Sequence, residues 1–393
     1  MKSSDGKILD RMPVGPLGLI PLRSCEKLGA KVDAYLSEWR SERNNSGDNS
    51  LVLAGYSQDS YIMNVATPRF GSGEGKGFIR SSVRGDDIFI MVDVLNHSIS
   101  YSLRGIKNHM SPDDHFQDLK RVIAAIGGKA RRINVIMPFL YESRQHKRSA
   151  RESLDCATAL QELVAMGVDN IITFDAHDIR VQNAIPLKGF DSGNATYQFI
   201  KNLLRCRPDL QIDNKHMLVL SPDEGGTNRA IYMANVLGLD MGIFYKRRDY
   251  SIVIDGRNPI VSHEYLGPDV TGKDIIILDD MISSGESMIE VAYEIKKRGA
   301  NRVFVAATFG IFTRGFEEFD KAYENGIITN IITTNLTYLP PEIYSKKYFI
   351  ECDMSKYIAL LIDALNHDES ISEYLNPYDR IQALLKKYRA SQS

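Results

Sequence analysis

Short apolar runs alternate along most of the chain with segments in which apolar residues recur every three or four positions. The runs are rich in Val and Ile and predict buried strands, whereas the periodic segments predict helices with one apolar face. The predicted strands are residues 51–54, 87–92, 133–137, 170–174, 217–220, 241–245, 274–278 and 302–308. The predicted helices are residues 113–126, 150–166, 195–205, 227–237 and 288–298. This alternation predicts an α/β fold in which helices flank parallel sheets.

Two polar segments interrupt the pattern and divide the chain. Residues 44–50 read Asn-Asn-Ser-Gly-Asp-Asn-Ser and follow a predicted helix at 25–39. Residues 186–194 contain Pro and Gly and lie between two groups of strands and helices. We therefore expect an N-terminal helical extension at 1–50, α/β domains at 51–188 and 189–345, and a helical C-terminal tail at 346–393.

Length, charge and cysteine usage exclude several classes of protein. The 393 residues suffice for two domains, each with its own core. The net charge of −2 provides no electrostatic footprint for nucleic acid or an anionic membrane. We find no apolar run long enough to span a bilayer and no signal peptide. The four scattered cysteines have no metal-ligand spacing and indicate reduced thiols in a cytoplasmic protein.

The strand predicted at 274–278 leads into the most informative stretch of the sequence. It is followed by Asp279-Asp280-Met-Ile-Ser283-Ser284-Gly285-Glu286-Ser287, and then by the helix at 288–298. Unpaired N–H groups at the start of a helix suit a phosphate. Two adjacent acids can bind a divalent cation through water, or the hydroxyls of a sugar. The stretch predicts a site for a phosphorylated sugar with magnesium nearby; the alternative is a plain turn with an acid-rich loop.

Two loops in the first predicted domain carry candidate nucleotide-binding groups. In open parallel sheets, ligands bind beyond the carboxyl ends of the strands. After residues 133–137, the cationic loop includes Arg144, Gln145 and His146, which could grip phosphates and a base or could simply be solvated. After residues 170–174, Asp175-Ala-His177-Asp178 offers an imidazole that is either a metal ligand or structural.

Two further loops follow strands of the second predicted domain. After residues 217–220, paired glycines at the start of a helix allow close approach of a ligand, with Asp223 facing the same place; a tight turn is the alternative. After residues 241–245, Lys246-Arg247-Arg248 is either a clamp on a polyanion or an exposed basic run.

In order and spacing, these loops resemble those of the ribose-phosphate pyrophosphokinase family over about residues 51–345. The most specific parts are Ser221-Pro-Asp223-x-Gly-Gly-x-x-Arg229-Ala and Asp279-Asp280-Met-Ile. Supporting matches are Ser143-Arg144-Gln145, Lys246-Arg247-Arg248, Asp175-Ala-His177 and Arg69-Phe70-Gly-Ser72-Gly73-Glu74. The resemblance implies two type I phosphoribosyltransferase-like domains. It also implies transfer of the diphosphoryl group of ATP to the anomeric hydroxyl of ribose 5-phosphate, which gives phosphoribosyl pyrophosphate and AMP.

The resemblance also assigns roles to individual residues. His177 and Asp223 would bind Mg²⁺. ATP would be bound by Arg69, Ser72, Arg144, Gln145, His177 and, from a neighbouring subunit of a dimer-based homo-oligomer or hexamer, Glu74. Asp279 and Asp280 would hold the ribose hydroxyls, and the 5-phosphate would lie against Ser283, Ser284, Gly285, Glu286 and Ser287. Lys246 and Arg248 would lie on a mobile loop and neutralise charge on the transferring group.

Four positions depart from the family pattern. Ser283, Ser72 and His146 each stand where the family usually has Asp. Glu286 brings a carboxylate close to the phosphate loop, which is unfavourable unless its side chain points away. The altered phosphate loop motivates one alternative, a non-catalytic regulatory paralogue. A second alternative, a type I phosphoribosyltransferase, would leave the loops before residue 186 unexplained.

Overall fold

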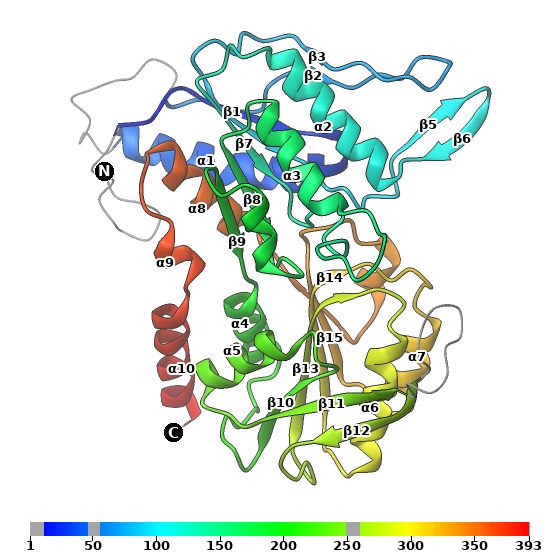
Figure 1. The fold of residues 1–393 in the computed structure, drawn as a ribbon. Coiled ribbons are helices and arrows are strands. Elements are labelled where there is room, and N and C mark those ends of the chain that lie inside the picture. Colours follow the sequence, from blue (N-terminus) through cyan, green and yellow to red (C-terminus); the bar gives the residue numbers. More distant parts are fainter. Residues whose placement is uncertain (1–11, 46–55, 249–259, 393) are drawn as a thin grey trace. The chain divides into compact units, whose positions relative to one another are not determined.

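The computed structural model describes residues 12–45, 56–248 and 260–392 (Figure 1). These residues form two compact units. The first contains the chain up to Asn194 together with residues 335–338 and 353–376, and the second contains residues 195–334, 339–352 and 377 onward. Within the described residues, no helix combines the length and apolar character needed to cross a membrane.

A parallel five-stranded sheet forms the centre of the first unit, in the order β1-β4-β7-β8-β9. Its strands are β1 (Leu17–Pro21), β4 (Asp87–Met91), β7 (Arg132–Ile136), β8 (Asn170–Phe174) and β9 (Gly189–Gly193). Its helices are η1 (Arg23–Cys25), α1 (Glu26–Asn45), α2 (Pro112–Ile126), α3 (Asp155–Ala165), η2 (Ile179–Ala184), α8 (Ser355–Asn366) and α9 (Ser372–Leu375). Two antiparallel hairpins pair β2 (Val65–Ala66) with β3 (Phe78–Ile79), and β5 (Ser100–Leu103) with β6 (Ile106–His109).

A seven-stranded sheet forms the centre of the second unit, in the order β12-β11-β10-β13-β14-β15-β16, with only β12 antiparallel to its neighbour. The strands are β10 (Met217–Ser221), β11 (Met241–Arg248), β12 (Ile260–Leu266), β13 (Asp274–Ile282), β14 (Val303–Gly310), β15 (Asn330–Thr334) and β16 (Phe349–Cys352). The helices are α4 (Thr196–Cys206), α5 (Thr227–Leu237), α6 (Glu286–Lys297), α7 (Glu317–Glu324), η3 (Pro341–Ser345) and α10 (Tyr378–Gln392).

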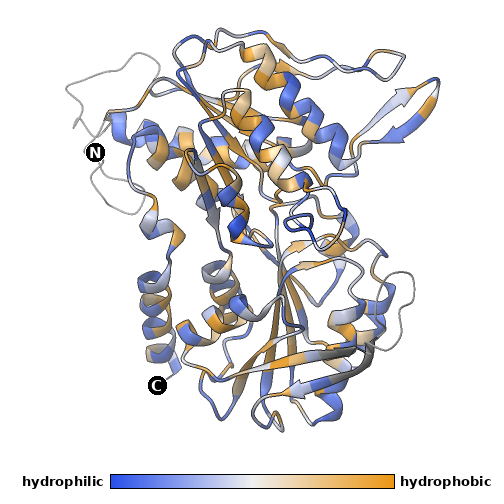
Figure 2. Cartoon of the chain, in the orientation of Figure 1, coloured by the Kyte–Doolittle hydropathy of each residue, from blue (hydrophilic) through white to orange (hydrophobic). Residues whose placement is uncertain are grey.

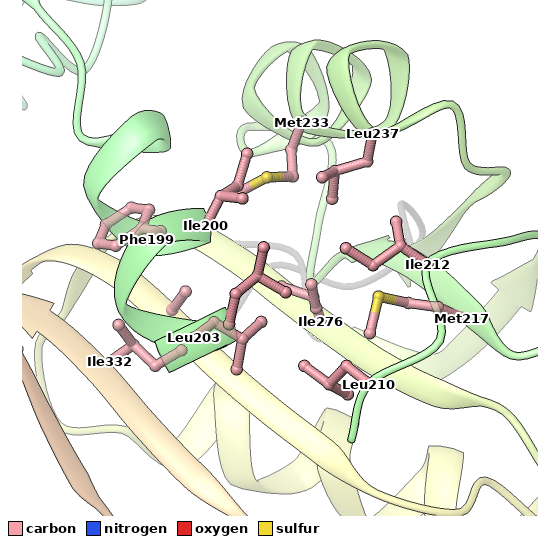
Figure 3. Close-up of a pocket in the computed structure, with 12 residues that line it drawn as sticks. Phe199, Ile200, Leu203, Leu210, Ile212, Met217, Met233, Leu237, Ile276 and Ile332 are labelled. Carbon is pink, nitrogen blue, oxygen red and sulfur yellow. The ribbon is translucent and has the colours of Figure 1, made fainter. Parts of the chain in front are cut away.

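Strand β13 is apolar on both faces because helices cover both sides of the second sheet. Ile275 and Ile277 belong to the core that also contains buried residues of α6 and α7. Ile276, between them, points toward α4 and α5 (Figure 3). The small cavity in that figure is lined by apolar side chains and has space for about one water molecule, which would find no polar partner there. Figure 2 shows that hydrophobic residues lie along the strands and that hydrophilic residues lie on the outer side of α10.

The predicted strands from residue 87 onward all overlap strands of the structure, while the strand predicted at 51–54 lies outside the described residues. The segment 186–194, interpreted as an interruption, contains the edge strand β9. Its sequence, Gly-Phe-Asp-Ser-Gly, has little strand propensity, so its pairing with β8 decides its conformation. Strand β1 was also missed, and it forms the opposite edge of the same sheet.

A buried ionic cluster joins α1 to α8 within the first unit. Arg40 and Arg43 of α1 both donate hydrogen bonds to the carboxylate of Asp363 in α8, and Arg40 Nη2 also reaches Asn366 Oδ1 at 2.7 Å. All of these side chains are buried. Burial also lowers the pKa of the adjacent His367 to about 4. The N-terminal helix, for which the sequence indicated no packing partner, therefore packs against a helix from the C-terminal part of the chain.

Replacement of Asp363 by Asn should destabilise the first unit strongly. The change keeps the side-chain shape but removes the carboxylate that pairs with two buried guanidinium groups, so we expect a loss of about 3–5 kcal/mol in the free energy of unfolding. Urea-induced unfolding measures this change in the free energy of unfolding. The matched control is Glu162→Gln, which breaks the more exposed pair with Lys120 and should cost less than about 1 kcal/mol. Equal effects of the two variants would contradict the central role of the cluster.

Candidate functional site

Parallel pairing of β10 with β13 brings the acidic residues of the second unit together. Register pairs Leu220 with Ile277, so the loop after β10 and the end of β13 lie at the same edge of the sheet. Asp279 and Asp280 belong to β13 itself, which continues to Ile282, whereas the sequence placed them in a loop after residue 278. Pairing with β14 explains the longer strand, since the ladder runs as far as Ile282 and Gly310.

Three carboxylates and one guanidinium make up this part of the site. Arg229 of α5 lies 3.6 Å from Asp280. Burial and the negative charges of Asp280 and Asp223 raise the pKa of the Asp279 carboxyl well above its ordinary value. The negative charges of these neighbouring acids repel one another, so the cluster favours a cation or hydroxyl donors as its ligand.

Asp223 fixes the turn that leads into α5. Its Oδ1 atom accepts hydrogen bonds from the backbone N–H groups of Gly225 at 2.9 Å and Gly226 at 3.3 Å. The Ser221 hydroxyl donates to the carbonyl oxygen of Asp223 at 2.6 Å. A Cβ atom on Gly226 would lie 2.9 Å from the Ser221 hydroxyl and 3.3 Å from the carbonyl oxygen of Leu278. The paired glycines thus allow the turn to pack closely against the end of β13.

The predicted phosphate loop connects β13 to α6. Gly285 precedes the helix in the left-handed region, with φ of 85°. A Cβ atom there would lie 2.1 Å from the ring of Phe319 in α7, so both conformation and space require glycine. The loop is also held by a hydrogen bond from Thr313 N–H to the Ser283 carbonyl at 2.9 Å. The first turn of α6, with Glu286 and Ser287, presents N–H groups in the manner that suits a phosphate.

The carboxylate of Glu286 forms an ion pair with Arg314, in the loop after β14. Both side chains are exposed. The negative charge that the sequence placed beside the phosphate loop is therefore compensated, and the side chain is turned toward Arg314. Arg314 was not singled out from the sequence. It could have been, because it follows a predicted strand in the way that every other candidate loop does.

In the first unit, the loops after β7 and β8 bring two imidazoles together. The ring centroids of His146 and His177 are 5.2 Å apart. The turn before His146 is closed by a hydrogen bond from Gln145 N–H to the Glu142 carbonyl at 2.8 Å. The guanidinium of Arg180 holds the carboxylate of Asp178, which lies 3.6 Å from Nε2 of His146. Gln145, its neighbour Arg144 and His177 thus follow strand ends, as the sequence predicted, and the structure adds that the two strands are neighbours.

The turn at residues 69–74 is held from inside by Arg69. Its side chain is nearly buried and pairs with Asp118 of α2, and its guanidinium carbon is 5.3 Å from the centroid of the Tyr101 ring. Ser72 and Glu74 are exposed and share a hydrogen bond of 2.7 Å. The geometry gives Arg69 a role in shaping the turn, whereas Ser72 and Glu74 are open to a ligand.

Lys246 and Arg248 lie in strand β11. The prediction that their backbone forms a loop was therefore wrong. The strand continues to Arg248 because β12, which the sequence did not predict, pairs with it antiparallel. The side chains of residues 246–248 lie outside the described part of the structure. Their proposed contact with the transferring group stays a prediction.

Gly285→Ala should impair the phosphate loop much more than Gly315→Ala. Both glycines have positive φ, but a Cβ atom at Gly315 meets nothing within 4 Å. Backbone strain alone costs about 1 kcal/mol, so the excess effect at residue 285 reports the clash with Phe319. Calorimetric titration with ribose 5-phosphate and thermal unfolding would measure both variants. Similar binding by the two would contradict a tightly packed loop.

Arg314→Ala should weaken binding of ribose 5-phosphate up to about fivefold, since an exposed ion pair is worth roughly 0.2–1 kcal/mol. The physical reason is that Glu286 would then repel the phosphate. The double variant Arg314→Ala with Glu286→Gln removes the repelling charge and should restore binding in the same titration. A double variant that binds as weakly as Arg314→Ala would show that Arg314 acts in another way.

Comparisons with known proteins agree with this arrangement. The N-terminal domain of ribose phosphate pyrophosphokinase matches residues 17–167, and the phosphoribosyl transferase domain matches residues 192–337. The match begins well before residue 51, where the sequence analysis started it, because β1 and α1 belong to the first domain. The predicted α/β fold with two phosphoribosyltransferase-like domains is confirmed.

Relatives resemble the chain over most of its length. The ribose-phosphate pyrophosphokinase of Vibrio parahaemolyticus is 30% identical over 317 residues, which cover 79% of this chain and 91% of the relative. The ribose-phosphate pyrophosphokinase of Shewanella oneidensis is 31% identical over 312 residues, which cover 77% of this chain and 88% of the relative. The crystal structure of phosphoribosylpyrophosphate synthetase from Mycobacterium smegmatis aligns with 90% of this chain and 99% of that chain, with a TM-score of 0.69; at 22% identity it shows a shared fold. The chain belongs to the ribose-phosphate pyrophosphokinase family.

Proposed function

We propose that this chain transfers the diphosphoryl group of ATP to the anomeric hydroxyl of ribose 5-phosphate, producing phosphoribosyl pyrophosphate and AMP. The observation that carries the proposal is the constellation in the second unit. Asp279 and Asp280 lie at the end of one strand, and the same strand leads directly into the glycine-initiated start of α6. The two carboxylates can accept hydrogen bonds from sugar hydroxyls, and the N–H groups at the start of α6 can donate to a phosphate. Together they complement a ribose 5-phosphate.

The two parts of the sugar-phosphate site have separate tasks. Asp279 and Asp280 would accept hydrogen bonds from the ribose hydroxyls and orient the anomeric hydroxyl for attack on the β-phosphorus of ATP. The 5-phosphate would be held by the N–H groups and hydroxyls of Ser283, Ser284, Gly285, Glu286 and Ser287. Fixing a nucleophile in this way supplies much of the rate enhancement in reactions that need no covalent intermediate.

The nucleotide and its metal would be bound by residues of the other loops. His177 would bind the metal, and Ser72, Glu74, Arg144 and Gln145 would bind ATP, with Glu74 acting on a neighbouring subunit and Arg69 shaping the turn that carries Ser72 and Glu74. Asp223 would also serve the metal, because its carboxylate is the type of oxygen donor that Mg²⁺ prefers. Bound Mg²⁺ would neutralise phosphate charge and polarise the phosphorus. Lys246 and Arg248 would stabilise charge that develops on the transferring oxygens.

We further propose that the enzyme works in the cytoplasm as a homo-oligomer. All four cysteines are free thiols, and three of them are buried, which fits a reducing compartment. The proposed role of Glu74 on a neighbouring subunit requires at least a dimer.

A non-catalytic regulatory paralogue remains the second candidate, because Ser283 and Glu286 depart from the family pattern. The ion pair between Glu286 and Arg314 weakens that candidate, since the added carboxylate is compensated. A type I phosphoribosyltransferase is less consistent, because it would leave the match of residues 17–167 unexplained.

A phosphorus NMR time course with ATP, ribose 5-phosphate and Mg²⁺ tests the proposal. We expect AMP and a ribose diphosphate ester to appear together. Lys246→Ala should reduce the rate about 10²–10³-fold, the usual cost of removing one donor to the transferring group. Formation of ADP would contradict the proposed diphosphoryl transfer. No product with any nucleoside triphosphate, while nucleotide still binds, would support the regulatory candidate.

A further inference from the structure

Two imidazoles of the first unit lie next to each other at one edge of the sheet. His146 follows β7 and His177 follows β8, and these strands are parallel neighbours, so both rings extend from the same sheet edge. Their centroids are 5.2 Å apart and their planes are inclined by 57°. Two imidazoles bound to one metal through nitrogens at about 2.1 Å, with an angle near 100° at the metal, have centroids roughly 5 Å apart. The observed separation is within the range of two imidazoles sharing one ion.

The surroundings of His146 orient the ring for this role. Its Nδ1 atom lies 3.2 Å from the carbonyl oxygen of Ser143, which can only accept, so Nδ1 carries the proton. In a neutral ring of this tautomer, the lone pair is on Nε2. A backbone carbonyl that fixes the tautomer of a ligating histidine is a frequent arrangement around metals.

A carboxylate adds negative charge near this lone pair. Asp178 Oδ2 lies 3.6 Å from Nε2 of His146, too far for a hydrogen bond. The carboxylate does not depend on His146 for its position, because Arg180 holds it through its side chain and Asp178 accepts the Arg180 backbone N–H at 2.9 Å. A cation beside the two rings would therefore meet an oriented nitrogen and a nearby negative charge.

We propose that His146 and His177 together hold the divalent metal of the reaction, and that His146 shifts the metal preference from Mg²⁺ toward nitrogen-binding ions such as Co²⁺ and Mn²⁺. The inference rests on the proposed function and deepens it. The altered preference is expected because His146 stands where the family usually has Asp. Mg²⁺ prefers oxygen donors, whereas imidazole suits first-row transition metals. Among the residues described, no three His, Cys, Asp or Glu side chains form a ready-made metal site. Oxygen donors, among them water and the nucleotide phosphates, would complete the coordination, so the metal would bind with the nucleotide.

The test compares metal binding by the full chain and two variants in the presence of a non-hydrolysable ATP analogue. Calorimetry would give the dissociation constants for Mg²⁺ and Co²⁺. His146→Asp restores the usual family residue, and His109→Asp makes the same change at an exposed histidine of the hairpin β5–β6. We expect the ratio of the Mg²⁺ to the Co²⁺ constant to fall at least tenfold in His146→Asp and to stay unchanged in His109→Asp.

A spectroscopic measurement separates ligation from an indirect effect. Pulsed EPR of the Mn²⁺ complex should show nitrogen modulation from two imidazoles in the unmodified chain and from one in His146→Asp. Thermal unfolding shows that each variant is folded, and His146→Asn, which lacks the carboxylate, should lose the same imidazole signal. An unchanged constant ratio, or one imidazole signal in the unmodified chain, overturns the inference.

Turnover is measured separately, so that the two proposals can fail independently. If the expected metal preference is found but no phosphoribosyl pyrophosphate forms with any of these ions, the shared ligation stands and the proposed function falls. If the product forms but the preference does not depend on His146, the function stands and the shared ligation falls.

Discussion

Parallel strand pairing is the constraint on which the rest of the structure depends. Strands that run in the same direction end at the same edge of a sheet, so loops that are distant in sequence become neighbours. In the second unit, the register of β10, β13 and β14 collects Asp223, Asp279, Asp280 and the loop with Arg314. In the first unit, the register of β7 and β8 does the same for His146 and His177. Backbone hydrogen bonds between buried strands thus determine which side chains meet at each sheet edge.

The apolar interior of the second sheet fixes the position of the acidic residues at its edge. Residues 275–278 of β13 are buried by helices on both faces, which fixes the strand, and Asp279 directly continues it. The same burial, together with the negative charges of Asp280 and Asp223, raises the pKa of Asp279. A ligand that brings a cation or hydroxyl donors reduces the repulsion between these neighbouring carboxylates, so the core favours binding of such a ligand.

The departures from the family pattern are accommodated by neighbours rather than by the altered residues themselves. Glu286 is paired with Arg314 from the next strand end, which keeps a carboxylate beside the phosphate loop tolerable. His146 is oriented by the carbonyl of Ser143 and lies beside His177. In each case the compensating group comes from a loop or strand end whose position only the sheet determines.

By itself, the sequence determined the α/β fold and the strand-end location of the candidate residues. Runs such as Ile275–Leu278 are apolar enough to specify buried strands, and Gly285 after a hydroxyl run specifies a loop into a helix. Tertiary structure decided the rest. Strand β9, Gly-Phe-Asp-Ser-Gly, has a weak local signal and forms because β8 supplies its hydrogen bonds. Residues such as Arg40 and Asp363 are 323 positions apart, and no local pattern relates them. Their contact, like those of Glu286 with Arg314 and His146 with His177, requires side chains that only the folded chain brings within reach.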